Sequence, residues 1–356
     1  RDQQQIPPSK EWEEFLDYGL QGVTIPEAYG GSPVDDVSES IIVEELARVD
    51  PSFAVMYCVH VGLCSKTIAL HGNEEQKKEF LPRLAAGEVG AYSLSEAGAG
   101  TDAAAMTCKA KLSDDGQHYI LNGEKMWVTN GAQAKILVLF AKDVDHPDYG
   151  VKKHGGSTAF IVDSSYEGFS VGKKEDKLGI RSSDTCTLIL ENCKVPVKNI
   201  LKGVGNGFPI AMNALDNSRI GIAAQALGIA SGALELSLAY SKERTTFGKP
   251  IHKHQSIAFK LADMATQVEA ARLMVLKAAA LKDAGEDYDL ASSMAKLYAS
   301  EVAMTQTIEA VQVHGGYGFV IEYHVERLMR DAKITQIYEG TSEVQKIVIS
   351  RSILAD

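Results

Sequence analysis

The stretch Ile257–Ala278, which reads IAFKLADMATQVEAARLMVLKA, places apolar residues along one side of a long helix. They follow one another at alternating steps of four and three residues, at Ile257, Leu261, Met264, Val268, Ala271, Val275 and Ala278. This spacing is typical of the seam along which antiparallel helices of a bundle pack together. Because such a seam normally forms core, the stretch predicts a helical bundle and does not predict a site.

The rest of the C-terminal part, from about residue 205, has helical character as well. The segment Ile220–Tyr240 is rich in small residues, which predicts a helix that packs closely against a neighbour. Ser342 and Gln345 fit a capping box, in which two side chains satisfy backbone groups at a helix start. They predict where the last helix begins.

The N-terminal part, up to about residue 87, also reads as helix. Apolar residues recur at helical spacing in the segments 12–20, 39–47 and 59–71, as expected for helices with one buried side. Asn73 stands before acidic and then basic residues, which predicts that it caps a further helix.

Between these helical parts the pattern changes to alternation. Residues 106–112 alternate, the turn Ser113–Gly116 follows, and residues 118–121 resume the strand pattern, which predicts a β-hairpin. Further candidate strands lie at residues 135–140, 157–162 and 187–190. The sequence therefore predicts a small antiparallel β domain, built as a barrel or a double sheet.

The length of 356 residues exceeds the ~250–300 residues at which a single core stops growing. We therefore expect three domains: an N-terminal helical domain at 1–87, a middle β domain at 88–197 and a C-terminal helical bundle at 198–356. The apolar fraction of 45% and the charged fraction of 23% are those of an ordinary globular protein.

The formal net charge of −11 argues against nucleic acid and anionic membrane surfaces as partners. No apolar run approaches the ~18 residues of a membrane span, since the longest, Ile136–Ala141, has the length of a strand. No targeting segment is expected at Arg1.

The cysteines form no C-x-x-C pair, which argues against a metal or redox motif and favours reduced, buried thiols inside a cell. They are Cys58, Cys64, Cys108, Cys186 and Cys193.

The segment Gly98–Ala103, GAGTDA, fits the dinucleotide-binding pattern G-x-G-x-x-A. That pattern needs a helix to begin at the glycines, so that its N-terminus faces the pyrophosphate. Here an alternating segment and a hairpin turn follow instead. We therefore reject NAD binding at this segment, while its small residues still let backbone N–H groups approach a flavin ring or a thioester.

Glu339 is the strongest candidate for a catalytic group. It lies in a short connection between two helical segments, with Tyr338 before it and Gly340 after it. A carboxylate that is removed from water has a raised pKa, and a general base works best with a pKa near the operating pH. A glutamate beside a helix start also occurs for its interaction with the helix dipole alone.

Six segments, taken in order, resemble the acyl-CoA dehydrogenase family over nearly the whole chain. They are Tyr92–Asp102, Lys125–Gly131, Asp216–Arg219, Arg244–Gly248, Gln312–Gly318 and Ile337–Glu343. The resemblance implies a mainly α protein with a central β domain: an N-terminal helical domain, a middle antiparallel β domain and a C-terminal four-helix bundle. Members of the family usually open with a further helix before the segment that starts here at Arg1.

The resemblance also implies a reaction, the FAD-dependent α,β-desaturation of a saturated acyl-CoA to the trans-2-enoyl-CoA. This reaction needs a base for the α-proton and a hydride acceptor for the β-hydrogen, and no side chain accepts hydride. Glu339 corresponds to the family's base, and flavin N5 is the acceptor. Some relatives carry the base at the position that is Ser218 here, which cannot serve as one.

The flavin ring is expected to contact Trp127, which can stack on it, and Thr129, which can hydrogen-bond its N5 edge. Without the resemblance, Trp127 would be read as a core aromatic. The full set implied for this half of the cofactor is Tyr92, Leu94, Ser95, Gly100, Thr101, Trp127, Val128 and Thr129.

A second set of residues resembles those that hold the ADP half of FAD. Arg244, Phe247 and Gln255 reach it from a neighbouring subunit in this family, and an arginine suits a pyrophosphate because of its planar fork of donors. Taken alone, Arg244 would be a partner for a helix dipole. The other members of this set are Gln312, Gly315, Gly316, Thr341 and Glu343, the last of which is Gln in some relatives.

The substrate is expected to contact Thr101, Asp216, Arg219, Tyr338 and Gly340. Asp216 and Arg219 correspond to residues that contact the CoA portion, although an ion pair at this spacing within a helix needs no ligand to explain it.

The chain is most similar to short-chain, butyryl-type members, judged on Ala224–Ala230 and Phe259–Met264, and we expect Val59 and Leu63 near the end of the acyl pocket. The resemblance further implies a homotetramer, built as a dimer of dimers, that passes electrons to electron-transferring flavoprotein. The location would be the cytoplasm of a bacterium or the mitochondrial matrix of a eukaryote. Two alternatives stay open: a flavin acyl-CoA oxidase, which is usually much longer, and a non-enzymatic helical scaffold.

Overall fold

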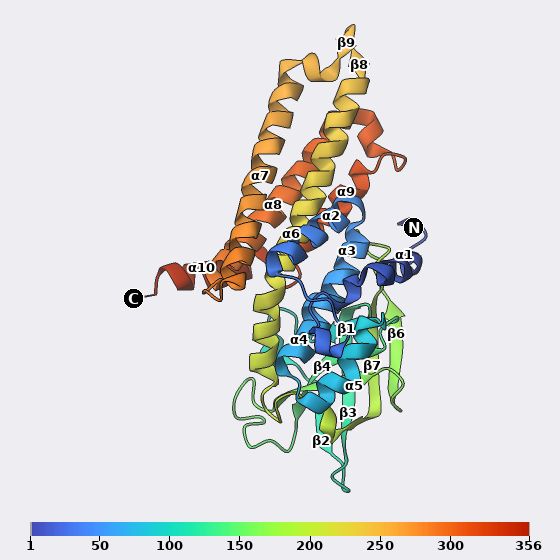
Figure 1. Cartoon of the computed structure of the whole chain (residues 1–356), viewed down its shortest axis with the longest axis vertical. Helices are drawn as coiled ribbons and strands as arrows, with labels where there is room; N and C mark the ends of the chain where they lie inside the picture. Colours follow the sequence, from blue (N-terminus) through green and yellow to red (C-terminus); the bar gives the residue numbers. More distant parts are fainter. Residues whose placement is uncertain (1, 356) are drawn as a thin grey trace.

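The computed structural model describes residues 2–355, and it is mainly helical with one β domain (Figure 1). The long helices α6 (Gly207–Glu243), α7 (Gln255–Asp283) and α8 (Asp289–His314) extend together along one part of the molecule. The strands lie at the other end, beside the N-terminal helices. This arrangement confirms the predicted fold class, whereas the domain boundaries 1–87, 88–197 and 198–356 stay predictions.

The N-terminal part is a series of short helices. They are α1 (Ser9–Glu14), η1 (Phe15–Tyr18), η2 (Leu20–Gly22), η3 (Glu27–Tyr29), α2 (Asp36–Val49), α3 (Pro51–Cys58), η4 (Val59–Ser65), α4 (Lys66–His71) and α5 (Glu74–Ala85). The helices predicted at 39–47 and after Asn73 are confirmed, and the Asn73 side chain accepts a hydrogen bond from the backbone N–H of Gln76 at 2.9 Å.

Two predicted N-terminal helices differ from the structure. The segment 12–20 is one short α-helix followed by 3-10 turns, because Gly19 adopts the left-handed conformation with φ +67° and ends the helical path. The segment 59–71 is the second half of a helical run that starts at Pro51, and its middle turn, Val59–Ser65, is a π-helix. Such turns often occur at functional sites.

Seven strands form a single sheet in the order β1-β4-β2-β3-β7-β6, with β5 paired to β4. They are β1 (Gly90–Ser93), β2 (Lys109–Leu112), β3 (His118–Thr129), β4 (Ile136–Asp143), β5 (Ser157–Asp163), β6 (Phe169–Lys174) and β7 (Thr185–Pro196). The predicted β2–β3 hairpin is confirmed. Most strand pairs are antiparallel, as predicted, but β1 and β2 both run parallel to β4, so the sheet is mixed. Parallel pairing needs a long connection, which the chain between β1 and β4 supplies.

The loop between β1 and β2 contains the segment Gly98–Ala103. It holds the 3-10 turn η5 (Ala103–Ala105) and, within these described residues, no α-helix. The helix that a dinucleotide-binding βαβ unit needs at these glycines is therefore not found in this loop. The shorter elements of the remaining chain are η6 (Val197–Asn199), β8 (Thr245–Thr246), β9 (Lys249–Pro250), η7 (Ile251–Lys253) and η8 (Gly315–Phe319).

The predicted apolar seam of α7 is core. Its residues from Leu261 to Ala278 are buried in one cluster with side chains of α6 and α8. The small residues of α6 allow close packing, as predicted: a Cβ on Gly228 would lie 2.3 Å from the carbonyl oxygen of Glu44 in α2. The helix itself begins at Gly207, thirteen positions before the predicted Ile220.

The last helices are α9 (Val325–Ala332), the 3-10 turn η9 (Lys333–Gln336) and α10 (Ser342–Ile353). The predicted capping box is off by one residue, because Thr341 caps α10 by accepting from the backbone N–H of Val344 at 3.3 Å. Ser342 instead donates to Glu301 in α8 at 2.9 Å, and Gln345 donates back to the connection before α10. The preceding threonine therefore takes the capping role that the sequence pattern gave to the serine.

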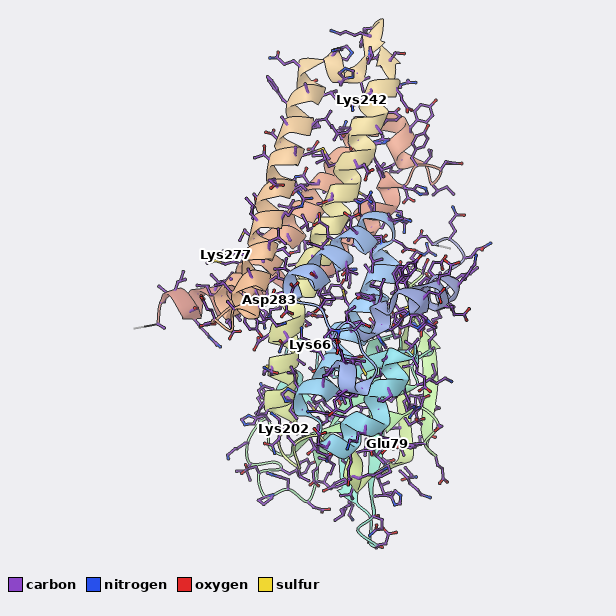
Figure 2. The ribbon with its side chains drawn as sticks, in the orientation of Figure 1. Lys66, Glu79, Lys202, Lys242, Lys277 and Asp283 are labelled. Atoms are coloured by element: carbon purple, nitrogen blue, oxygen red, sulfur yellow. The ribbon has the colours of Figure 1, made fainter. Side chains whose placement is uncertain are left out.

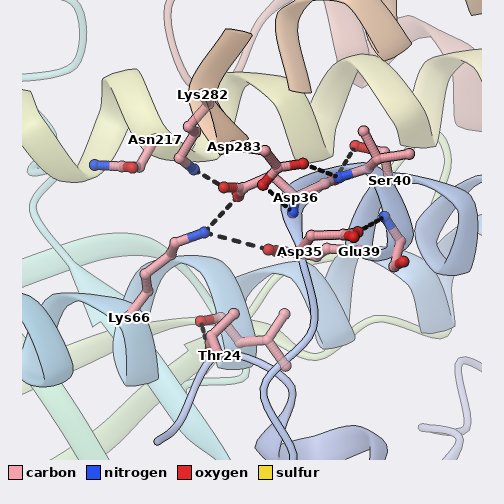
Figure 3. Close-up of polar contacts among 12 residues, drawn as sticks. Thr24, Asp35, Asp36, Glu39, Ser40, Lys66, Asn217, Lys282 and Asp283 are labelled. Atoms are coloured by element: carbon pink, nitrogen blue, oxygen red, sulfur yellow. Dashed lines mark hydrogen bonds and ion pairs between the residues drawn. The ribbon is translucent and has the colours of Figure 1, made fainter. Parts of the chain in front are cut away.

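A polar cluster joins the N-terminal helices to the bundle (Figure 3). Asp36, at the start of α2, accepts from Lys66 of α4 at 2.7 Å and from Lys282 of α7 at 2.8 Å. Glu39 lies 3.3 Å from the same Lys66 amino group, and Asp283 accepts the backbone N–H of Asp36 at 2.7 Å. We call these five residues the α2–α4–α7 cluster. Figure 2 shows its members Lys66 and Asp283 midway along the molecule.

Two helical runs are long and apolar enough to cross a membrane by length and composition, Pro51–His71 and Gly207–Glu243. The sequence analysis predicted no apolar run of this length, because small and polar residues stand between the apolar residues of both segments. Of the most apolar window in each run, 83% and 67% are buried inside the protein, as in core helices. All five cysteines are free and buried, as predicted.

Candidate active site

Glu339 lies in the connection between η9 and α10, and its backbone is strained. Its φ is +51°, in the left-handed region that a non-glycine residue rarely adopts, and Gly340 follows with φ +91°. Such conformations persist when the surrounding structure holds them in place, and they gather at functional sites. The chain thus turns sharply at the residue that the sequence singled out.

The Glu339 carboxylate is surrounded by protein groups from the bundle. Ser218 of α6 donates a hydrogen bond to its Oε2 atom. Burial raises the pKa of Glu339, while the Ser218 hydrogen bond and the positive charges of Lys296 and Arg219 lower it. The balance leaves the pKa at about 7, so the group can both hold and release a proton near neutral pH.

Tyr338 fixes the other side of the same connection. Its hydroxyl donates to Gln225 of α6, and the Gln225 amide donates to the carbonyl oxygen of Pro51 at 3.0 Å. Two neighbouring residues, Tyr338 and Glu339, are therefore both tied to α6, which orients the connection against the bundle.

A cavity of about 310 Å³ lies between the β domain and the segment that leads to Glu339. Trp127 and Thr129 line it from β3, while Ile334, Ile337 and Tyr338 line it from the other side. Trp127 is 53% exposed and has φ +57°, so its indole stands out of the strand rather than in the core. The alternative reading of Trp127 as a core aromatic is therefore wrong.

This cavity fits the isoalloxazine part of a flavin. Its walls are largely apolar and include one indole face, which suits a flat aromatic ring. The hydroxyl of Thr185, also on the lining, is buried and has no hydrogen-bond partner among residues 2–355. A buried polar atom normally has a partner, so a ligand with polar edges suits this position.

One wall of the cavity is the loop 177–180, which α9 holds in place. The Asp331 carboxylate accepts the backbone N–H of Ile180 at 2.5 Å, and Arg330 donates to the carbonyl oxygen of Leu178 at 3.1 Å. Gly179 packs so closely that an added Cβ would lie 2.1 Å from the carbonyl oxygen of Arg330. Burial raises the pKa of Asp331 to about 7, against the lowering effects of the Ile180 hydrogen bond and of Arg327.

The other residues predicted around the flavin ring differ in their surroundings. Tyr92 in β1 and Leu94 in the following loop are buried. Burial raises the pKa of Tyr92, and the charge of Glu339 raises it further. Val128 is buried in the β-domain core and does not line the cavity. Ser95 is half-buried, whereas Gly100 and Thr101 are exposed on the β1–β2 loop.

The residues predicted for the ADP half lie elsewhere in the chain. Arg244, Gly315 and Gly316 line a second cavity of about 560 Å³, where the Arg244 guanidinium lies 5.3 Å from the ring centre of Tyr317. Phe247, with 96% exposure, sits on the β8–β9 tip at the far end of the bundle from the β domain (Figure 1). Gln255 and Gln312 are exposed. One chain therefore does not bring the two predicted halves together.

The predicted substrate residues Asp216 and Arg219 form an ion pair of 2.5 Å within α6. Arg219 is buried, and its Nε atom has no hydrogen-bond partner among residues 2–355. Burial raises the pKa of Asp216, although the Arg219 charge opposes the shift. Val59 and Leu63 are buried in the π-helical turn, in one cluster with Tyr92.

Thr341 and Glu343 follow Glu339 in the chain. Thr341 uses its hydroxyl to cap α10, and Glu343 is exposed. The structure also places residues at the site that sequence reasoning missed, namely Lys296, Gln225, Asp331 and Gln345. For Lys296 in SSMAKLYAS and Gln225 in IAAQALG, the signal was a polar or charged residue among the small and apolar residues of a helix, whereas Asp331 and Gln345 stand among other polar residues and gave no such signal.

Comparisons with known proteins cover nearly the whole chain. Family models of the acyl-CoA dehydrogenases match the N-terminal domain at residues 1–88, the middle domain at 91–193 and the C-terminal domain at 205–354. The short-chain-specific acyl-CoA dehydrogenase of Clostridium acetobutylicum is 49% identical over 347 residues, which are 97% of this chain and 90% of the relative.

Two solved structures are similar over at least 99% of this chain and 92% of their own. The butyryl-CoA dehydrogenase of Megasphaera elsdenii has a TM-score of 0.94 and 48% identity. A chain from a study of the electron transferring flavoprotein of Acidaminococcus fermentans has a TM-score of 0.96 and 48% identity. Solved members of the family also include complexes with FAD and FADH2. The chain therefore belongs to the acyl-CoA dehydrogenase family, and it is an FAD-dependent oxidoreductase of acyl-CoA thioesters.

Proposed function

We propose that the chain converts a short-chain saturated acyl-CoA to the trans-2-enoyl-CoA, with Glu339 as the base that removes the α-proton. The observation that carries this proposal is the half-buried Glu339 itself: its carboxylate accepts from Ser218, partial removal from water raises its pKa to about 7, and it follows directly on Tyr338 in the cavity wall. A base with such a pKa is ionised in part at neutral pH and still basic enough to act.

The residues around the base have distinct tasks. Ser218 donates to the carboxylate and stabilises its ionised form. The ion-paired Arg219, with its free Nε donor, offers a positive charge to the anionic CoA portion. Trp127 and Thr129 would hold the flavin ring, with Tyr92, Leu94, Ser95, Gly100 and Thr101 along its border. FAD, when bound, supplies the hydride acceptor.

We further infer a homotetramer in which a second copy completes each cofactor site. The β8–β9 turn, which follows Arg244 and contains Phe247, lies at the tip of the bundle, whereas β3, which carries Trp127, belongs to the β domain at the other end (Figure 1). Phe247 is 96% exposed, so its ring is available for contact with another copy. Gln255, Gln312, Gly315 and Gly316 would meet the ADP half from the same side.

Electron-transferring flavoprotein is the proposed electron acceptor, supported by the similar chain that was solved in a study of that protein. Similar curated relatives come from the bacteria Clostridium acetobutylicum and Bacillus subtilis, which supports a place in the bacterial cytoplasm. A flavin acyl-CoA oxidase is the competing function. Oxygen uptake with butyryl-CoA in the absence of another acceptor would identify an oxidase and contradict the proposal.

Anaerobic flavin reduction by butyryl-CoA, octanoyl-CoA and palmitoyl-CoA tests the substrate class. We expect butyryl-CoA to bleach the flavin absorbance fastest, with crotonyl-CoA as the product. Faster bleaching by palmitoyl-CoA would contradict a short acyl pocket near Val59 and Leu63. Absence of bleaching by all three esters would contradict the proposed reaction.

A further inference from the structure

Lys296 of α8 is a completely buried lysine close to the proposed base. Its side chain has no exposed surface, and its Nζ atom donates to the carbonyl oxygen of Gly340 at 2.6 Å. No carboxylate forms an ion pair with it within residues 2–355. A buried charge is costly unless it is paired or hydrogen-bonded, so a single carbonyl partner is an unusual environment for an ammonium group.

The carbonyl that Lys296 contacts belongs to the strained turn. Glu339 and Gly340 both have positive φ, and Gln345 donates to their carbonyl oxygens at 3.2 and 3.1 Å. Gln345 is itself completely buried. Lys296 and Gln345 therefore hold the backbone of the turn from two helices, while the Glu339 side chain is left free to meet Ser218.

The same ammonium is an electrostatic partner of the base. Its charge lowers the pKa of Glu339, and burial together with Arg219 lowers the pKa of Lys296 to about 8 although Glu339 raises it. The other titratable groups around the pair come from each neighbouring element: Asp216 and Arg219 of α6, Glu301 of α8, Glu343 of α10, Cys58 of α3, Tyr92 of β1 and the adjoining Tyr338.

We propose that Lys296 is the positioning residue of the base: its ammonium holds the Gly340 carbonyl, and its positive charge stabilises the ionised form of Glu339. This inference rests on the proposed function, in which Glu339 removes the α-proton. Lys296 then has two effects, the hydrogen bond to Gly340 and the positive charge near Glu339. They can be separated, because a neutral donor can replace the hydrogen bond without replacing the charge.

Two substitutions separate these effects. Lys296→Gln keeps a donor for Gly340 and removes the charge, whereas Lys296→Met removes both. The measurement is the rate of anaerobic flavin reduction by butyryl-CoA in the holoenzyme, as a function of pH and of substrate concentration. Lys142→Met is the matched control, because the Lys142 amino group also donates to a backbone carbonyl, that of Lys153, on the exposed surface of the β domain.

Loss of the positive charge raises the pKa of Glu339, so both Lys296 variants need a higher pH to ionise the base. We expect the acid limb of their rate profile to move up by about one pH unit, which is about a tenfold loss of rate on the acid side. Lys296→Met should also lose rate at high pH, with KM little changed, and Lys296→Gln should lose less. Lys142→Met should keep the wild-type profile.

An acid limb that stays in its wild-type position in variants that retain FAD would overturn the inference. Loss of FAD or of the fold in both variants would make Lys296 purely structural and would overturn it as well. Glu339→Gln distinguishes the two levels: if that variant is reduced at the normal rate, the proposed function fails. If Glu339→Gln is inactive and the acid limb of the rate profile of the Lys296 variants does not move, only the proposed role of Lys296 fails.

Discussion

Ser218 donates its hydroxyl hydrogen to Oε2 of Glu339, and this bond links α6 to the connection that carries the proposed base. By the family resemblance, some relatives place their base at the position of Ser218. Here the same position supplies a hydrogen-bond donor to the base instead. Because the hydrogen bond favours the ionised carboxylate, it partly offsets the raising of the pKa by burial.

Ser218→Ala should therefore raise the pKa of Glu339 above its present value of about 7. A hydrogen bond to a charged group contributes about 1.5 kcal/mol or more, which corresponds to about one pH unit. We expect the acid limb of the pH–rate profile for flavin reduction to move upward by that amount. Retention of the wild-type limb would show that the bond does not stabilise the ionised form. Ser350→Ala, on the outer part of α10, is a control.

Asp331→Asn should change how stability depends on pH. The pKa of Asp331 is about 7 in the folded protein and ~3.9 in the unfolded chain. The folded state therefore binds more protons between these values, and stability falls as the pH rises through this window. We expect the variant, which stays neutral, to gain Tm over the wild type at about pH 8 and to lose that gain near about pH 5. A constant difference at both pH values would contradict the assignment.

Gly179→Ala should weaken FAD binding. The new methyl group would lie 2.1 Å from the carbonyl oxygen of Arg330, so the loop that forms one wall of the cavity proposed for the flavin would have to move. Gly221→Ala in α6 is the control, because a Cβ there meets only the Cys58 sulfur at 3.8 Å, an ordinary contact distance. We expect a rise in the Kd for FAD, measured by flavin fluorescence on reconstitution, of about tenfold or more for Gly179→Ala and little change for Gly221→Ala.

Asp36→Asn should destabilise the junction between the N-terminal helices and the bundle. Burial raises the pKa of Asp36, but Lys66 and Lys282 lower it further, so the net pKa is below the ordinary value. Its contribution is present above the unfolded pKa of ~3.9 and is lost as the pH falls through the folded value.

At neutral pH the Asp36→Asn substitution leaves two partly buried lysines without their shared carboxylate, which costs about 3 kcal/mol. Thermal unfolding at about pH 7 and about pH 3 measures this difference, which should shrink at the lower pH. Asp148→Asn breaks an exposed pair with Lys152 and should change stability by less than about 1 kcal/mol. Equal losses in the two variants would contradict a special role of the α2–α4–α7 cluster.

Local patterns in the sequence predicted most of the helices, the bundle seam and the β2–β3 hairpin, because they depend on spacing and turn residues. Patterns could not predict that β1 and β2 run parallel to β4, since this pairing joins segments far apart in the chain. The π-helical turn Val59–Ser65 was also missed, because an apolar run in a buried helix does not reveal its hydrogen-bond register.

Motifs in the sequence single out Glu339 and Trp127 as candidate site residues, and their roles stay predictions. The site was not predictable where one residue acts through the backbone of another. Lys296, Gln345 and Asp331 lie on core faces of helices, and only the fold brings them to the Gly340 carbonyl and the Ile180 amide. Lys296 and Asp331 contact segments that are distant in sequence, whereas Gln345 contacts a residue only five positions before it.

The central claim is that Glu339 removes the proton from the α-carbon of the acyl-CoA. The most direct measurement is the loss of flavin absorbance on anaerobic mixing of butyryl-CoA with the Glu339→Gln holoenzyme, next to the wild type at equal FAD content. The account predicts that the variant retains FAD and binds the ester but is not bleached, because an amide cannot accept the proton. Bleaching at the wild-type rate would contradict it.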